Sequence, residues 1–97
     1  MPIGKPRAGI YDARMADPRS ALTDALAAHV GVPPLTPDEI ESVLELASVA
    51  AHGTGERTAA PLASFLAGML AAGSADRLAA LGEMRRIAEE ATTPGAG

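Results

Sequence analysis

The chain has 97 residues, no cysteine and a formal net charge of −4. Without cysteine, a disulfide framework, a thiolate metal site and a cysteine nucleophile are all excluded. The negative charge and the low aromatic content, Tyr11 and Phe65 alone, argue against a nucleic-acid partner, because such binding depends on clustered Lys and Arg and on base stacking. No apolar run reaches the roughly 18 residues that cross a bilayer. The start of the chain also lacks the apolar stretch of a secretory signal, so we expect a cytoplasmic protein with no membrane partner.

Residues 1–16 differ in composition from the rest of the chain. Proline and glycine interrupt any helical period there, and basic side chains occur at Lys5, Arg7 and Arg14. Such a segment cannot bury enough apolar surface to fold by itself. We therefore expect a disordered or extended basic segment over 1–16, followed by a folded domain over 17–91 and a flexible tail over 92–97.

The first expected helix begins at Asp17 as N-cap, with Pro18 at its first position, and stops at Gly31. Proline is well tolerated at the first helical position because the N–H that it lacks would have no partner within the helix. The apolar stripe of this helix consists of Leu22, Leu26 and Val30. The following Val32-Pro33-Pro34-Leu35 forbids helix and predicts a stiff connector.

The second expected helix has the clearest start signal in the chain. Thr36 is its N-cap, Pro37 follows, and Glu39 completes a capping box. We expect Gly53 to end it. The expected apolar face consists of Ile40, Val43, Leu44, Ala47 and Ala51. The opposite, polar face consists of Glu41, Glu45, Ser48 and His52.

The third expected helix starts between Thr58 and Pro61, runs to Gly73, and carries no charge on any side. At 100° per residue, its large apolar side chains fall on one face: Leu62, Phe65, Leu66, Met69 and Leu70. Its small residues fall on the other: Ala60, Ser64, Ala67, Gly68 and Ala71. A helix that is apolar all round needs cover on more than one side. It is therefore either the central helix of a bundle or half of a subunit interface, with the small face as the candidate interface.

The fourth expected helix begins at the N-cap Ser74. It buries Leu78, Leu81, Met84, Ile87 and Ala88 and leaves Glu83, Arg86 and Glu90 outside as spaced ion pairs. No segment shows a convincing strand pattern. The predicted fold is therefore all-α, a compact bundle of four helices with short connections.

These same residues carry a resemblance to a known family. The order Leu44-Glu45-Leu46-Ala47, Ala51-His52-Gly53, Arg57, Ala60-Pro61-Leu62 and Phe65-Leu66-Ala67-Gly68 resembles a small actinobacterial helical domain of unknown function. That domain is found alone or fused to the C-terminal side of molybdenum-cofactor guanylyltransferase-like proteins. The resemblance extends from about Asp17 to Ala91, and it implies a link to molybdopterin chemistry without assigning a reaction.

The turn between the second and third helices is the candidate ligand site, with His52, Arg57 and Thr58 as its residues. Thr54 to Thr58 form a turn of free N–H groups before a helix, a geometry that binds anions, but no G-x-x-x-x-G-K-[ST] pattern accompanies it. His52 and Arg57 each also have a purely structural explanation. His52 suits the last turn of a helix, where the dipole favours a cation, and Arg57 could pair with Glu56 or Glu45.

Two functions from different classes remain. The preferred one is a non-catalytic helical interaction or accessory module that self-associates or binds a protein of cofactor synthesis. The alternative is a domain that binds a small molecule or anion, such as a phosphorylated pterin or a nucleotide, at the His52–Arg57 corner. An enzyme is less expected, because no nucleophile lies at a recognisable spacing from a base. We expect no catalytic residues, no metal site and no cofactor.

Overall fold

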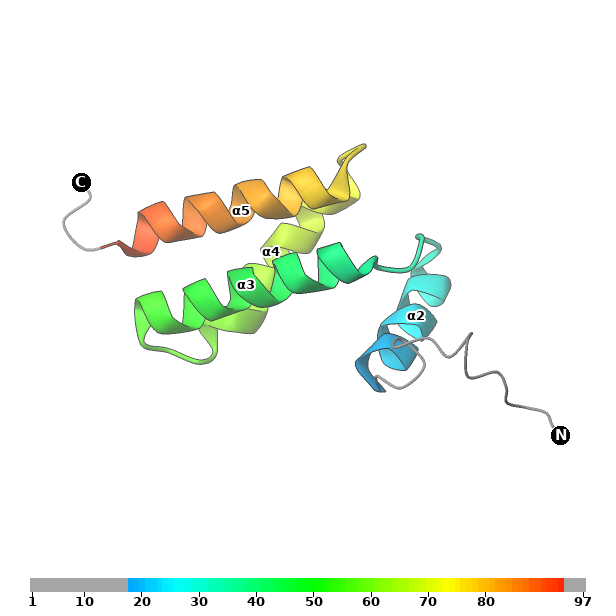
Figure 1. Cartoon of the computed structure of the whole chain (residues 1–97), viewed down its shortest axis with the longest axis horizontal. Helices are drawn as coiled ribbons and strands as arrows, with labels where there is room; N and C mark the ends of the chain where they lie inside the picture. The colour runs from blue at the N-terminus through cyan, green and yellow to red at the C-terminus, as the bar shows by residue number, and fades with distance from the viewer. Residues whose placement is uncertain (1–17, 94–97) are drawn as a thin grey trace, which may run out of the picture. The chain divides into compact units, whose positions relative to one another are not determined.

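The structure is a computed structural model that describes residues 18–93, and every regular element in this range is an α-helix (Figure 1). The helices are α2 (Pro18–Val30), α3 (Pro37–Thr54), α4 (Ala59–Ala72) and α5 (Arg77–Thr92). The all-α prediction with four helices is confirmed. The chain divides into two compact units, residues 1–35 with α2 and residues 36–97 with the other three helices. The predicted basic segment 1–16, the N-cap at Asp17 and the last four residues of the predicted tail lie outside the described residues.

Helix α2 ends as the sequence predicts. Gly31 has φ +87°, and its N–H donates to the Ala27 carbonyl at 2.9 Å. Glycine adopts this left-handed conformation without steric cost, which explains why the helix stops there. The side chains of its apolar stripe, Leu22, Leu26 and Val30, are exposed.

The start of α3 also confirms its prediction. Thr36 is extended, and its Oγ1 accepts a hydrogen bond from the Glu39 N–H at 3.1 Å. Glu39 Oε1 in turn accepts from the Thr36 N–H at 2.8 Å. Both bonds of the capping box are therefore present, and they satisfy two N–H groups that the first helical turn leaves without partners.

The end of α3 differs from the prediction. Gly53 remains helical, and the helix ends at Thr54, with Gly55 in the left-handed conformation at φ +76°. Gly53 has a different role, because a Cβ atom there would lie 2.5 Å from the Cβ of Thr92 in α5. The absence of a side chain at Gly53 thus allows the ends of α3 and α5 to approach closely.

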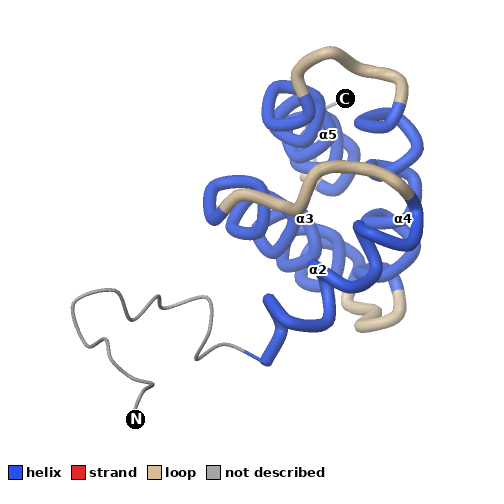
Figure 2. Tube along the Cα trace, turned by 90° about the vertical axis from the view of Figure 1, so that its right-hand side faces the viewer, coloured by secondary structure: helices blue, strands red, loops and turns tan. Residues whose placement is uncertain are grey.

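The second unit is a three-helix arrangement in which α3 and α5 run in the same direction and α4 runs in the opposite one (Figure 1). Each pair of the three helices is in contact, and Figure 2 views α3 and α5 nearly end-on with α4 beside them. The buried core of this unit consists of Leu46, Ala67, Ala71, Ala80 and Leu81. Three of these five residues are alanines, so the helices pack through small side chains around Leu46, which is 1% exposed.

The face that α3 turns to this core is rotated from the predicted one. Leu46 and Ala50 are buried, whereas Leu44, expected on the apolar face, is exposed. Val43 packs against the core as predicted. Glu39 shares the buried side of the helix with Leu46 and Ala50, and the capping box and its partner in α5 hold it there. The sequence did not indicate that this side faces the core, because its first residue is the carboxylate Glu39.

Helix α5 begins two residues later than expected, and the N-cap is Asp76 instead of Ser74. Asp76 Oδ1 accepts from the Ala79 N–H at 3.0 Å, while the Ser74 hydroxyl accepts from the Asp76 N–H at 3.1 Å. Ser74 thus forms a local turn that positions the true cap. At its other end the helix continues into the predicted tail, since Thr92 is helical and its hydroxyl donates to the Ala88 carbonyl at 2.7 Å.

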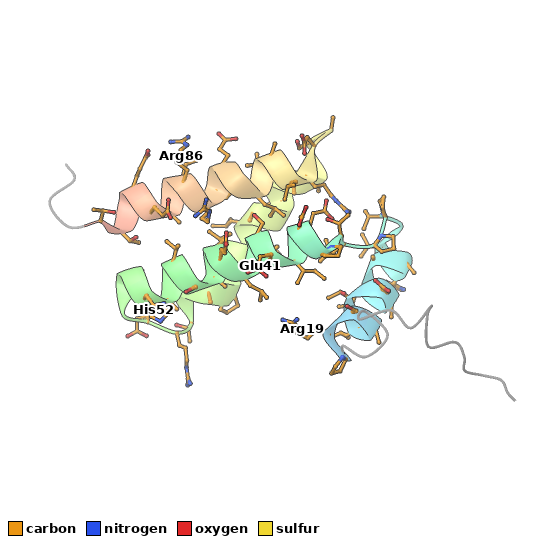
Figure 3. All side chains as sticks on the ribbon, in the orientation of Figure 1. Arg19, Glu41, His52 and Arg86 are labelled. Carbon is orange, nitrogen blue, oxygen red and sulfur yellow. The ribbon has the colours of Figure 1, made fainter. Side chains whose placement is uncertain are left out.

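The burial predicted for α5 holds in part. Leu81 is buried, and Met84 and Ala88 pack against the core as expected. Leu78 and Ile87 are instead exposed. On the outer side of the helix, Arg86 forms the predicted ion pair with Glu90 at 2.9 Å, and Figure 3 shows Arg86 pointing away from the other helices.

Candidate functional site

The small face of α4 is used inside the chain. Ala67 is fully buried and Ala71 is buried, both in one cluster with Leu46, while Ala60 and Ser64 are half-buried. Gly68, the fifth residue of the predicted interface, is exposed, and an added Cβ there would meet nothing within 4 Å. The cover that we predicted for this face thus comes from α3 and α5, and Ala67 and Ala71 are not accessible to another chain.

The opposite side of α4 is exposed and entirely apolar. We call it the apolar face of α4, and its five residues are exposed as follows: Leu62 66%, Phe65 70%, Leu66 55%, Met69 61% and Leu70 41%. Together they expose roughly 500 Å² of apolar surface, near the upper end of the range of about 300–600 Å² for the largest patch of a typical monomer. This helix therefore buries Ala67 and Ala71 and exposes its three leucines.

The packing of small residues explains this orientation. With alanine at the contact, neighbouring helix axes can approach to the short end of the usual range of about 8–10 Å, and backbone atoms then join the van der Waals contacts. The glycine at position 53 allows the same close approach between α3 and α5. The large side chains of α4 lie on the side away from this contact and are exposed.

The predicted ligand corner holds three exposed side chains that no hydrogen bond joins to one another. His52 Nδ1 lies 3.0 Å from both the hydroxyl and the carbonyl oxygen of Ser48, one turn earlier in α3. Figure 3 shows His52 near the end of this helix. Thr58 stands at the N-cap of α4 without a side-chain capping bond. The corner is therefore open, and His52 is bonded to its own helix.

Arg57 forms no ion pair with any of the residues 18–93. The partners considered from the sequence were Glu56 and Glu45. Glu45 instead lies 3.6 Å from Arg85 of α5. Arg57 is thus an exposed cation just before the start of α4, where the helix dipole is itself positive.

Several of the N–H groups expected to bind an anion already have partners. The Gly55 N–H donates to the Ala51 carbonyl at 2.9 Å, and the Glu56 N–H donates to the Thr54 hydroxyl at 3.1 Å. At the start of α4, the N–H groups of Ala59 and Ala60 donate to the carbonyls of Glu56 and Arg57. Within the predicted turn of free N–H groups, Thr54 to Thr58, the prediction is therefore wrong for Gly55 and Glu56.

Residues 16–96 match a family model described as a domain of unknown function, DUF6457. The chain belongs to the DUF6457 family. The match includes all four described helices, so in DUF6457 α2 belongs to the same conserved model as the three-helix unit. No curated protein and no solved structure matches the chain.

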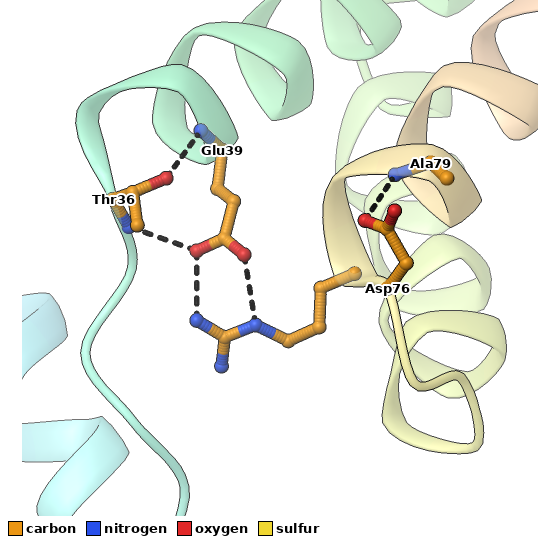
Figure 4. Close-up of polar contacts among 5 residues, drawn as sticks. Thr36, Glu39, Asp76 and Ala79 are labelled. Atoms are coloured by element: carbon orange, nitrogen blue, oxygen red, sulfur yellow. Dashed lines mark hydrogen bonds and ion pairs between the residues drawn. The ribbon is translucent and has the colours of Figure 1, made fainter.

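One polar cluster of this DUF6457 domain was not predicted. Arg77, the first residue of α5, donates from Nε to Glu39 Oε2 at 3.0 Å and from Nη2 to Glu39 Oε1 at 2.7 Å (Figure 4). The Glu39 and Arg77 side chains are 9% and 21% exposed. These hydrogen bonds from Arg77 lower the pKa of the Glu39 carboxyl, against the opposing effect of its burial. The pair fixes the start of α5 to the start of α3.

This cluster is structural, because both carboxylate oxygens of Glu39 accept hydrogen bonds from within the chain. Oε1 accepts from the Thr36 N–H as well as from Arg77, so one carboxylate serves the capping box and the ion pair together (Figure 4). One feature of the sequence could have predicted the Glu39–Arg77 pair. Arginine at the first position of a helix is disfavoured by the dipole and needs a nearby carboxylate.

Residues 18–93 of this DUF6457 chain contain neither a metal-ligand cluster nor a membrane-spanning helix. No three side chains among His, Asp and Glu gather there in a way that could hold a metal ion. None of the helices there has both the length and the apolar character that crossing a membrane requires.

Proposed function

We propose that this DUF6457 chain is a non-catalytic protein-interaction module that self-associates through the apolar face of α4. The observation that carries the proposal is the exposure of five large apolar side chains on successive turns of one helix. Contiguous apolar patches of this size on soluble proteins mark interaction sites. The face contains no charged residue, so covering it requires no charge to be removed from water.

A second copy of the chain is the occupant that the surface area favours. A standard interface buries roughly 800 Å² on each partner, and the apolar face of α4 supplies most of that with its polar rim still to be added. The area of the apolar face of α4 therefore suits an interface with a second copy of the chain.

The test is the mass of the chain in solution as a function of concentration. Sedimentation equilibrium or light scattering at micromolar concentrations should show a dimer, and Leu66→Glu should convert it to a monomer, because a carboxylate would be buried in the centre of the contact. Ile87→Glu is the matched control, since Ile87 is also an exposed apolar residue but lies on α5. A wild-type chain that stays monomeric at about 100 micromolar would contradict the proposal.

We further propose, from the resemblance described above, that the module is an accessory partner in molybdenum-cofactor biosynthesis. Three residues of the motif, Leu62, Phe65 and Leu66, belong to the apolar face of α4. The motif therefore overlaps the surface to which we assign the function. The experiment is co-elution of the purified chain with a molybdenum-cofactor guanylyltransferase-like enzyme. Failure to co-elute would refute this link and leave self-association standing.

Anion binding at the His52–Arg57 corner is the second candidate function. Arg57 favours it, since its guanidinium is exposed and has no ion pair among the described residues. Calorimetry with a pterin phosphate and with a nucleotide tests it directly. Binding that disappears in Arg57→Ala, with unchanged thermal stability, would support this function. Absence of binding to the wild-type chain would remove it.

A further inference from the structure

We propose that two copies pair with their α4 helices antiparallel, with Leu66 at the twofold axis and Arg57 of each copy beside Asp76 of the other. This inference rests on the self-association proposed above and adds the orientation and the ionic contacts of the pair. Three observations carry it: the layout of the apolar face, the charges at the two ends of α4, and the direction of the helix dipoles.

The apolar face has a centre that suits a twofold axis. Leu62 and Leu70 bound it and lie about 12 Å apart along the helix, with Leu66 midway between them. In a twofold contact, residue i meets residue j and j meets i. An antiparallel pair centred on Leu66 therefore places Leu62 against Leu70 twice and Leu66 against itself. The whole face is then covered, and no large side chain is left at either end.

The charges at the ends of α4 distinguish antiparallel from parallel pairing. Arg57 precedes the helix and Asp76 follows it, and both are exposed. α4 itself extends roughly 9–10 Å to either side of Leu66, and Arg57 and Asp76 belong to the turns at its two ends. Antiparallel pairing therefore brings the turn that carries Arg57 in one copy to the turn that carries Asp76 in the other. Parallel pairing instead brings Arg57 close to Arg57.

Both groups are available for this contact. Arg57 forms no ion pair within its own chain among the described residues. Asp76 uses Oδ1 to cap α5 through the Ala79 N–H, a bond that leaves its charge in place. Arg57 also lies at the positive end of its own α4 dipole, which disfavours a cation. In the antiparallel pair it lies at the negative end of the other α4, so the same side chain becomes stabilising.

Cysteine cross-linking tests the orientation, because the native chain has no cysteine of its own. Under mild oxidation Leu66→Cys should form a disulfide with itself. Leu62→Cys and Leu70→Cys should each link poorly alone and efficiently when mixed, since a disulfide needs Cα atoms within about 7 Å. Each variant is first checked for helical content and melting temperature. Leu62→Cys linking to itself faster than to Leu70→Cys would overturn antiparallel pairing.

Two single-charge changes test the ionic contact. Arg57→Ala removes the cation, and Asp76→Asn removes the anion while keeping a good N-cap for α5. At low salt each should raise the dimer Kd about three- to tenfold, and the double variant should be no weaker than either single one. Arg86→Ala is the control, because Arg86 pairs with Glu90 on the outer side of α5. Additive effects, or no effect of Arg57→Ala, would overturn the contact.

The results separate this inference from the function on which it rests. A wild-type chain that never dimerises overturns both. A wild-type dimer that Leu66→Glu dissociates, but in which Leu62→Cys links to itself, overturns the antiparallel arrangement and leaves the proposed function intact.

Discussion

The two faces of α4 carry side chains of different size, and the core lies on the side of the small ones. Ala67 is fully buried, while its neighbour Leu66 is 55% exposed. Both faces are uncharged, and the one with the larger apolar side chains is the one that faces outward. The small side chains of α4 are the ones that pack against Leu46 of α3 and Leu81 of α5, and alanine at such a contact allows helix axes to approach closely. The exposed apolar surface of this chain thus follows from the close packing of its small residues.

The largest expected effect is the loss of stability when a leucine of the core is truncated, and the same truncation on the apolar face of α4 is its comparison. Leu46→Ala empties the centre of the three-helix unit and should lower the free energy of unfolding by about 2–5 kcal/mol. Leu66→Ala removes the same atoms from the apolar face and should cost less than about 1 kcal/mol in dilute solution. Chemical denaturation followed by circular dichroism measures both.

Measuring both leucine variants at several protein concentrations provides the control. Where the chain associates, the dimer adds to the apparent stability of the wild type, and Leu66→Ala should lose part of that addition. Leu46→Ala should be destabilised at every concentration. Equal costs for the two variants in dilute solution would show that the large face packs inside the chain, contrary to the structure.

Local signals were enough to predict most of the helices. The capping box at Thr36 and Glu39 and the glycine after α2 are determined by neighbours in the sequence, and both are confirmed. The end of α3 was not predictable in this way. Gly53 and Gly55 are equally good terminators locally, and it is Gly53 that fits against Thr92, 39 residues later in α5.

The candidate sites were harder to predict, because each depends on contacts between distant segments. An uncharged helix such as α4 gives no hydropathy signal for its inward side, so the interface was expected on the small face. The Glu39–Arg77 pair joins residues from two helices, and the local pattern explained Glu39 fully as a capping residue. The sequence offered Glu56 and Glu45 as ion-pair partners of Arg57, and only the structure shows that Arg57 forms no ion pair within residues 18–93.

The next largest effect concerns the buried ion pair between Glu39 and Arg77, in contrast to the uncharged faces of α4. Arg77→Ala leaves the Glu39 carboxylate buried without its main partner and should cost about 1–3 kcal/mol at neutral pH. The pKa of Glu39 is lowered in the folded state, so this stabilisation is present above the ordinary glutamate pKa of about 4.3. It is lost as pH falls through the lower, folded-state value.

The pH dependence distinguishes this pair from simple packing. The wild type should lose stability over that acidic range, and the difference between wild type and Arg77→Ala should shrink as Glu39 becomes protonated. Glu39→Gln keeps a capping side chain and removes the charge, so it should flatten the same part of the profile. Parallel profiles for the wild type and Glu39→Gln would show that another carboxylate governs acid stability.

A smaller loss is expected where α3 and α5 approach most closely. Gly53→Ala places a Cβ 2.5 Å from the Cβ of Thr92, which is too close for any real contact. Because the Thr92 Cβ is not the movable end of a side chain, the last turns of the helices must separate, at a cost of about 1–2 kcal/mol. Thermal unfolding measures the loss. An unchanged melting temperature would show that the ends of α3 and α5 are not in contact.

The smallest expected effect is a gain in stability, and it concerns Gly68 in α4. At Gly68 an added Cβ meets nothing within 4 Å, and the backbone is helical. Gly68→Ala should therefore stabilise the chain by about 0.5–1 kcal/mol, since alanine is the better helix former. The same variant should leave the dimer Kd unchanged, because Gly68 lies outside the apolar face of α4. If Gly68→Ala dissociates the dimer instead, a second copy must contact α4 through its small residues, and the assignment of its two faces would have to be exchanged.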